Sequence, residues 1–251
     1  MIAYKKLVVS GCSFTVGDSW AHWLAKQYNL ELINLSCPGA GNKHISDSLV
    51  VYLEQNKRDI TEVLIGAMWS GIARHHWTIS LDDPKYTKYH RHQYDKDVFL
   101  TFPHEILNDN SLTKDMVIHD PDLAMLELAY YRGISARKLD GLLSIIHLNS
   151  YLNSNKYAFF QTHFFDPDGD ERQGGHMVGT RYTDAYETFR IARPSSGVLT
   201  FAPDLFLGNW AANQNLILSK NDHHPTVPGH RLWTETVLIP QLIQQKLLSD
   251  G

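Results

Sequence analysis

The sequence predicts an α/β protein of three layers, in which a doubly wound parallel sheet of about five strands lies between two layers of helices. Three observations predict this class. Short apolar runs of strand type recur along the chain, and the first ends in glycine. Segments with apolar residues at helical spacing separate these runs. At 251 residues, the chain is also long enough for one large domain of this kind.

The N-terminal part of the chain shows the alternation most clearly. A first strand is expected at residues 6–10, because this apolar run stops at Gly11. A helix is expected at 19–28, where two tryptophans, a leucine and a tyrosine recur at helical spacing. A strand, a helix and a further strand are then expected at 31–35, 45–56 and 62–67.

The rest of the chain adds a fourth strand and two helices. A strong helical period covers residues 121–153, an aromatic run predicts a strand at 157–162, and a closing helix is expected at 233–248. Two long stretches, at about 75–120 and 166–221, show no clear period. We interpret them as insertions into a single domain, because structureless loops of this length are usually lids or binding segments.

Composition and charge exclude several classes of partner. The formal net charge is −4 and the basic residues are scattered, so no nucleic-acid partner is expected. No apolar run approaches the roughly 18 residues that span a bilayer, and no signal-peptide core precedes the first strand, so no membrane association is expected. Two cysteines, Cys12 and Cys37, are too few for a disulfide scaffold and fit a reducing compartment. A cytoplasmic protein is therefore expected; the oligomeric state is left open.

Polar side chains follow several of the predicted strands, where ligands bind in open parallel sheets. They lie at Ser13, in the turn at 39–42, at Ser70 and in the segment 222–225. A serine hydroxyl becomes a nucleophile when a histidine takes its proton, and a carboxylate holds that histidine in the correct tautomer. Ser13, His224 and Asp222 are the candidates for these three roles. The oxyanion could be bound by the backbone N–H groups of Ser13 and Gly39, with the side chain of Asn42 or Ser70.

These residues occur in an order that resembles the SGNH or GDSL hydrolases. Residues 11–15 (GCSFT) resemble the nucleophile motif of that family, with Cys12 in place of the usual aspartate. Residues 34–39 (NLSCPG) are similar to its second motif, 64–70 (LIGAMWS) lie where the third is expected, and 222–225 (DHHP) resemble the motif that carries histidine and acid. The resemblance implies a flavodoxin-like sheet and a serine esterase, with Gly39 as the oxyanion glycine and His224 as the base.

Two positions depart from the family pattern. Ser70 stands where the family has its oxyanion asparagine, and Asn42 is a candidate to compensate. The family usually places its aspartate three residues before the histidine, where this chain has Asn221, whereas Asp222 lies two before. These departures motivate an alternative hypothesis, in which the fold binds a glycan but catalysis is impaired.

The expected substrate is a short acyl ester, with an O-acetyl group on a carbohydrate preferred; acyl transfer to a sugar hydroxyl is an alternative to hydrolysis. Trp69, Arg74 and Trp77, at and after the third strand, are expected to contact the substrate. The first insertion also contains aromatic residues that could stack on a sugar ring, namely Trp77, Tyr86, Tyr89 and Tyr94.

Two other chemistries compete with the serine mechanism. The 14 histidines match no recognised zinc signature, so no metal and no cofactor is expected, and a metal-dependent hydrolase is the least favoured hypothesis. Cys12 is a rival nucleophile. Successive residues after a strand point in different directions, so only one of Cys12 and Ser13 can face the site, and Ser13 is favoured.

Overall fold

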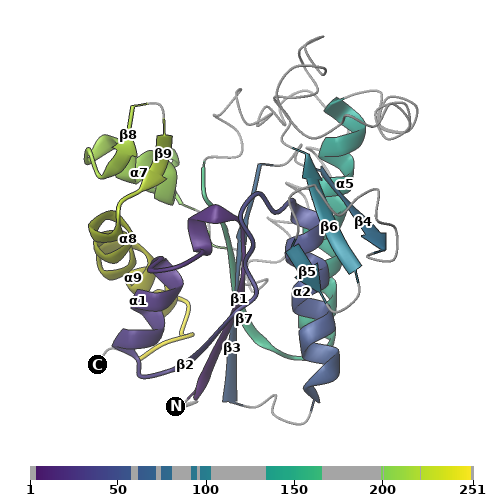
Figure 1. Cartoon of the computed structure of the whole chain (residues 1–251). Helices are drawn as coiled ribbons and strands as arrows, with labels where there is room; N and C mark the ends of the chain where they lie inside the picture. Colours follow the sequence, from purple (N-terminus) through teal and green to yellow (C-terminus); the bar gives the residue numbers. More distant parts are fainter. Residues whose placement is uncertain are drawn as a thin grey trace.

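The fold is described from a computed structural model of the chain. It describes residues 4–57, 62–71, 75–80, 92–94, 97–102, 134–165, 199, 201–220 and 222–249, and of 75–80, 92–94, 97–102 and 134–139 the backbone alone. A parallel sheet lies between two layers of helices in this structure (Figure 1). The predicted three-layer α/β class is therefore confirmed.

The sheet has four parallel strands among the described residues, where about five were expected. They are β1 (Lys6–Ser10), β2 (Glu31–Asn34), β3 (Val63–Trp69) and β7 (Ala158–His163), in the order β2-β1-β3-β7. Each runs parallel to its neighbours. The Gln161 carbonyl of β7 accepts a hydrogen bond from the Leu199 N–H at 2.7 Å, so Leu199 lies beside this strand.

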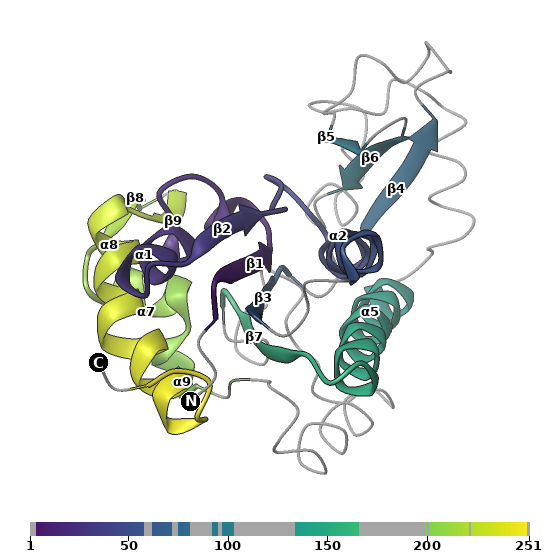
Figure 2. The same cartoon turned by 90° about the horizontal axis from the view of Figure 1, so that it is seen from below.

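The helices cover both faces of the sheet (Figures 1 and 2). One layer contains α1 (Trp20–Gln27), α7 (Leu207–Asn213), α8 (Val227–Trp233) and α9 (Ile239–Gln244). The opposite layer contains α2 (Asn42–Gln55) and α5 (Ile134–Ser154). No helix in the described part of the chain is long and apolar enough to cross a membrane.

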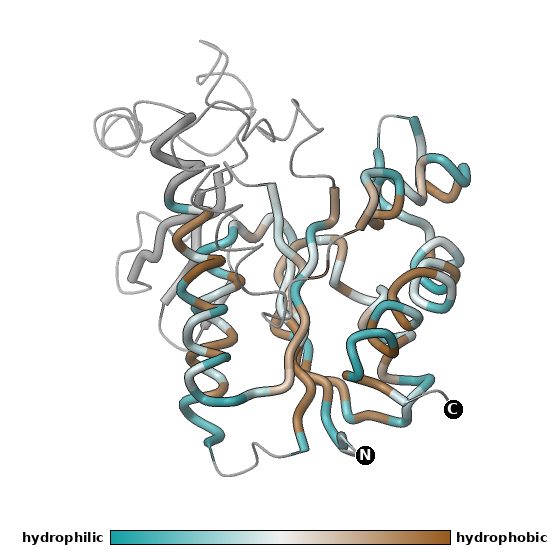
Figure 3. The backbone as a smooth tube through the Cα atoms, turned by 180° about the vertical axis from the view of Figure 1, so that it is seen from behind, coloured by the Kyte–Doolittle hydropathy of each residue, from teal (hydrophilic) through white to brown (hydrophobic). Residues whose placement is uncertain are grey.

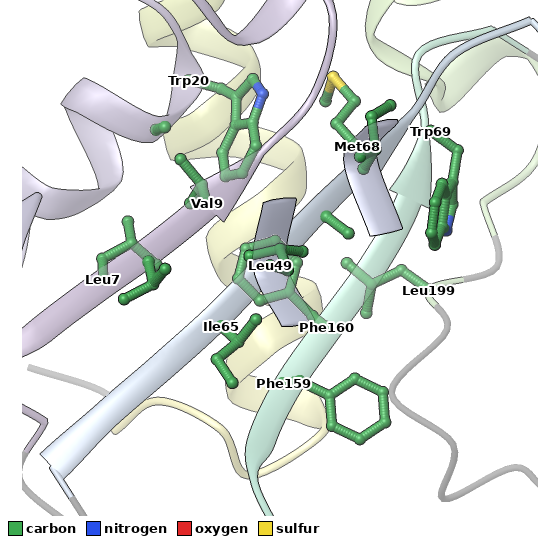
Figure 4. Close-up of a cluster of buried hydrophobic side chains, with 14 of the residues drawn as sticks. Leu7, Val9, Trp20, Leu49, Ile65, Met68, Trp69, Phe159, Phe160 and Leu199 are labelled. Carbon is green, nitrogen blue, oxygen red and sulfur yellow. The ribbon is translucent and has the colours of Figure 1, made fainter. Parts of the chain in front are cut away.

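The hydrophobic core follows the two central strands, which are the apolar centre of the molecule in Figure 3. All seven residues of β3 are buried, because helices cover both faces of a doubly wound sheet. Trp20 of α1 meets Phe160 of β7 edge to face, with ring centroids 5.7 Å apart (Figure 4). Both rings lie over Gly66, where a Cβ atom would come within 2.7 Å of the Phe160 ring. This close approach requires a glycine in the middle of the strand.

The closing helix begins earlier than predicted, at Val227 instead of Trp233. The Thr226 side chain caps it by accepting a hydrogen bond from the Gly229 N–H at 3.2 Å. After α8 the chain makes one turn of π-helix, η6 (Thr234–Leu238), and then continues as α9. Pro240 explains this turn, because its ring would clash with the carbonyl of Thr236 in a regular α-helix.

Both predicted insertions contain regular structure. In the first, β4 (His75–Ser80), β5 (His92–Tyr94) and β6 (Asp97–Phe102) form an antiparallel sheet in the order β4-β6-β5. The second contains η5 (Pro203–Leu205), α7 and β8 (Ile217–Ser219), which pairs with β9 (Asp222–Pro225). The expectation of irregular structure is wrong for these residues, because strands and helices this short show no resolvable period. The helix expected at 121–153 is described from Ile134 onwards. Within the two insertions, residues 81–91, 95–96, 103–120, 166–198, 200 and 221 lie outside the described chain.

Two buried histidines lie near the carboxyl edge of the sheet and in the helix layer beside it. His163 ends β7 and is 5% exposed, and His230 of α8 is 7% exposed. Burial lowers the pKa of His163 to about 4. Burial, with a smaller contribution from the nearby His224, lowers the pKa of His230 to about 4 as well. Both rings are therefore neutral in the folded protein at neutral pH.

We expect Gly66→Ala to lower the free energy of unfolding by about 1–3 kcal/mol, since the added methyl group would overpack the contact between Trp20 and Phe160. Urea unfolding measures the change. Leu143→Ala, at a side chain 39% exposed on α5, is the control and should change the free energy of unfolding by less than about 0.5 kcal/mol. An unchanged unfolding midpoint for Gly66→Ala would contradict the packing described here.

We expect acid to destabilise the fold between pH 6.5 and about 4, the ordinary and the folded pKa values of His163 and His230. In this window the unfolded chain binds protons that the folded chain excludes, so stability is fully present above pH 6.5 and is lost as the pH falls. Thermal unfolding across this range should show a falling Tm. The slope of Tm against pH should be shallower in His163→Gln and shallowest in the double variant that also carries His230→Gln. An unchanged slope in the double variant would assign the acid sensitivity to other groups.

Candidate active site

The candidate nucleophile lies on a tight turn directly after β1. Residues 13–15 form one turn of 3₁₀ helix, η1 (Ser13–Thr15), with the Thr15 N–H donating to the Cys12 carbonyl at 2.9 Å. Gly11 permits this turn, because a Cβ atom there would lie 2.2 Å from Thr15 Oγ1. The apolar strand therefore stops at Gly11 for a steric reason, and the chain turns sharply enough to present Ser13 at the edge of the sheet.

Asn34 connects the nucleophile turn to the end of the neighbouring strand. Its Nδ2 donates to the Thr15 carbonyl at 2.7 Å, and its Oδ1 accepts from the Ser36 N–H at 3.0 Å. The Cys37 N–H also donates to the Gly11 carbonyl at 3.1 Å. These bonds hold the loop after β2 against η1. Sequence reasoning placed Asn34 in a motif without giving it this role; its position at the end of a predicted strand was the available signal.

Ser13, His224 and Asp222 form a hydrogen-bonded chain. His224 Nε2 lies 2.7 Å from Ser13 Oγ, and His224 Nδ1 lies 2.5 Å from Asp222 Oδ1. The same carboxylate oxygen accepts the His224 backbone N–H at 3.0 Å. Both His224 and Asp222 come from β9, which lies toward the same end of the sheet as the turn after β1 (Figure 1). An aspartate two residues before the histidine therefore reaches it.

The electrostatics favour a base at His224. The pKa of Asp222 is lowered, chiefly by the backbone hydrogen bond from His224 and next by the bond from the His224 ring. An ionised Asp222 accepts a hydrogen bond from Nδ1–H, which leaves the Nε2 lone pair to accept a hydrogen bond from the Ser13 hydroxyl. The side chains of His224 and Asp222 are 40% and 47% exposed, so solvent reaches this pair.

The candidate oxyanion residues lie in the loop after β2 and at the end of β3. Gly39 has a φ of +79°, a left-handed conformation that favours glycine. Asn42 is fully buried at the start of α2, and its Oδ1 accepts the Ser70 N–H at 2.8 Å. Asn42 Nδ2 and Ser70 Oγ are buried and have no hydrogen-bond partner within the described chain. The structure therefore joins Asn42 and Ser70 through one hydrogen bond, and one further polar atom of each has no partner among the described residues.

The structure describes the three residues expected to contact substrate to different extents. Trp69 is fully buried and its indole N–H donates to Gln161 Oε1 at 3.0 Å, so it belongs to the core and does not line the substrate site. Its place on a strand covered by helices on both faces is the reason. Arg74 lies outside the described residues. The backbone of Trp77 is in β4, and its side chain is outside the description.

Both cysteines of the chain are buried. Cys12 is 0% exposed and Cys37 is 5% exposed, and both are free thiols. Burial raises the pKa of Cys37 to about 12, so this thiol is neutral at physiological pH. The position of Cys12 supports Ser13 over the rival cysteine nucleophile. The residues that the structure describes contain no group of three or more histidine, cysteine or acidic side chains that could hold a metal ion.

Comparison with known proteins bears on the fold. No family model and no curated protein matches the chain in sequence. Among solved structures, the psychrotrophic esterase EstA from Pseudoalteromonas sp. is similar with a TM-score of 0.50 and 10% identity, over 97% of this chain and 100% of that one. TesA is similar with a TM-score of 0.50 and 10% identity, over 96% and 99%. A member of the lipolytic protein G-D-S-L family from Veillonella parvula DSM 2008 has a TM-score of 0.46 and 13% identity, over 93% and 96%.

At these identities the similarity concerns the fold. It extends over nearly the full length of this chain and of EstA and TesA. This chain therefore shares its three-layer α/β fold with EstA and TesA.

Proposed function

We propose that the protein is a serine ester hydrolase of the SGNH or GDSL type, with a single domain that spans residues 1–251, and that it cleaves a short acyl ester. One observation carries this proposal: Ser13 Oγ, His224 and Asp222 form a continuous hydrogen-bonded chain at the carboxyl end of a parallel sheet. The fold shared with the esterase EstA supports it. The chemistry rests on the site, because one fold hosts many functions.

In the proposed mechanism, Ser13 Oγ attacks the ester carbonyl carbon while His224 Nε2 takes the hydroxyl proton. Asp222 holds the ring through Nδ1 and stabilises the imidazolium. The imidazolium returns the proton to the leaving alcohol as the C–O bond breaks, which leaves an acyl group on Ser13. Water then attacks the acyl carbon and gives its proton to His224, which returns it to Ser13 Oγ as the acid is released.

The oxyanion would be bound by the backbone N–H groups of Ser13 and Gly39 and by the side chain of Asn42. The Ser70 N–H occupies Asn42 Oδ1, which fixes the orientation of the amide and leaves Nδ2 as the available donor. Asn42 would thus replace the asparagine that the family has at the position of Ser70. The Ser70 hydroxyl, which also has no partner in the described chain, is the alternative donor.

The proposed substrate is an O-acetyl group on a carbohydrate. Its support is the aromatic content of the first insertion, where Trp77 and Tyr94 belong to β4 and β5. A sugar hydroxyl in place of water in the second step would make the protein an acyltransferase. The two free cysteines support the proposed cytoplasmic location, because reducing compartments keep thiols unpaired.

A second candidate, a glycan-binding protein with impaired catalysis, is favoured by Ser70 at the position of the family's asparagine. A serine-reactive phosphonate separates the two. Stoichiometric modification of Ser13 would support an activated hydroxyl and the hydrolase; no modification, together with glycan binding, would support the binding protein.

For hydrolysis of p-nitrophenyl acetate with EDTA present, we expect Ser13→Ala and His224→Ala to lose at least about a thousandfold in kcat, since the two groups act as one unit. Asp222→Asn should lose about a hundredfold or more, because the histidine loses its orienting carboxylate. Cys12→Ala is the control and should retain activity. Full activity in Ser13→Ala would refute the mechanism, and loss confined to Cys12→Ala would assign the nucleophile to the thiol.

We expect Asn42→Ala to lower kcat about a hundredfold to a thousandfold with little change in KM, because the oxyanion donor acts in the transition state. Ser70→Ala is the matched control: it removes the hydroxyl and keeps the backbone N–H that orients Asn42. Steady-state kinetics of the two variants decide between the donors. A large loss in Ser70→Ala with normal kinetics in Asn42→Ala would assign the third donor to Ser70.

A further inference from the structure

Three aromatic rings, Phe14, Phe164 and Phe165, form an aromatic shelf against the ring of His224. Phe14 stacks on His224 with centroids 4.6 Å apart and an interplanar angle of 26°. Phe164 stacks on Phe14 at 4.4 Å and 28°. Phe165 meets Phe14 and Phe164 edge to face, at 5.6 Å and 4.6 Å. The imidazole therefore rests on a stack two rings deep.

The shelf is fixed by the backbone around it. Phe14 and Phe164 are 5% and 2% exposed. The Phe164 N–H donates to the Trp69 carbonyl at 3.3 Å, and the Phe164 carbonyl accepts the Gly208 N–H at 2.7 Å. Gly208 lies directly against Phe165, since a Cβ atom there would lie 2.2 Å from that ring. The ends of β3 and β7 and helix α7 thus hold the rings in place.

The hydrogen bonds of His224 leave one motion, a tilt of the ring plane, that a flat surface against the ring would restrict. The bonds to Ser13 Oγ and Asp222 Oδ1 lie on opposite sides of the ring. Rotation of the ring about the line that joins these partners would tilt its plane while weakening both bonds only gradually. The His224 side chain is 40% exposed, so solvent offers no fixed contact on its open side. A flat ring against one face removes this freedom.

We infer that Phe14 is a positioning residue for the base of the proposed hydrolase: its ring sets the plane of the His224 imidazole so that Nε2 points at Ser13 Oγ. The inference rests on the proposed function. Because Phe14 follows Ser13 in η1, one rigid turn carries both the nucleophile and the surface that orients its base. Alignment of this kind contributes to catalysis without contact with the substrate.

The test compares Phe14→Leu, which keeps apolar bulk but has no flat ring, with Phe14→Tyr, which keeps the ring. We expect Phe14→Leu to lower kcat about tenfold while KM changes by less than about twofold, and Phe14→Tyr to keep kcat within about threefold of wild type. Phe14→Met provides a second non-planar variant if the leucine variant does not fold. Steady-state ester hydrolysis and the rate of phosphonate labelling of Ser13 are the readouts, with Tm measured for each variant.

Phe159→Leu is the matched control. Phe159 is 4% exposed, like Phe14, but lies near the start of β7, at the end away from Phe164 and Phe165. It should lower Tm as Phe14→Leu does and leave kcat unchanged. Three results would overturn the inference and leave the proposed function intact. They are an unchanged kcat in Phe14→Leu, equal losses of kcat in Phe14→Leu and Phe14→Tyr, and a loss of kcat in Phe159→Leu equal to that in Phe14→Leu. Full activity in Ser13→Ala, or a wild type that neither hydrolyses esters nor takes the label, would overturn both.

Discussion

Thr15 is the residue through which the nucleophile turn is fixed to the rest of the molecule. Its carbonyl accepts hydrogen bonds from the side chains of Ser19 and Asn34, both at 2.7 Å, and its hydroxyl accepts the Trp20 indole N–H at 3.1 Å. A turn of three residues has no cooperative helical stability of its own. These bonds, from α1 and β2, therefore supply the rigidity that Ser13 needs. Loss of the Trp20 indole would remove this partner of the buried Thr15 hydroxyl, whereas the carbonyl would keep one of its two donors if Ser19 or Asn34 were replaced.

The sheet beneath this turn is held in register by buried polar contacts as well as by packing. The Trp69 indole donates to Gln161, and Gln161 in turn donates to Asn149 at 3.2 Å, which joins β3, β7 and α5. Ser10 and Ser48 share a hydrogen bond of 2.8 Å between β1 and α2. Buried hydrogen bonds between side chains of different elements favour a single arrangement of those elements. The loops at the carboxyl edge are therefore mounted on a scaffold that fixes their relative positions.

The geometry of an extended strand explains how this chain supplies its acid. Alternate residues of a strand point to the same side, so Asp222 and His224 share one face of β9. A hydrogen bond from the His224 N–H to the Asp222 carboxylate reinforces that arrangement at 3.0 Å. The spacing of two residues, unlike the usual spacing of three, is thus compatible with contact because β9 is a strand here. The same strand turns the His224 ring onto Phe14.

The sequence by itself determined the class of the fold, the four strands of the sheet and the candidates Ser13, His224 and Asp222. Strands buried on both faces are nearly continuous apolar runs, and the polar residues that follow them are visible as interruptions. Only the tertiary structure decided the start of the closing helix, the antiparallel sheet β4-β6-β5, the burial of Trp69 and the stack of Phe14 on His224. The stack, for example, joins a residue of the first turn of the chain to one near its C-terminal helices. Local periodicity in the sequence does not predict such contacts, because packing between layers determines which side chains meet.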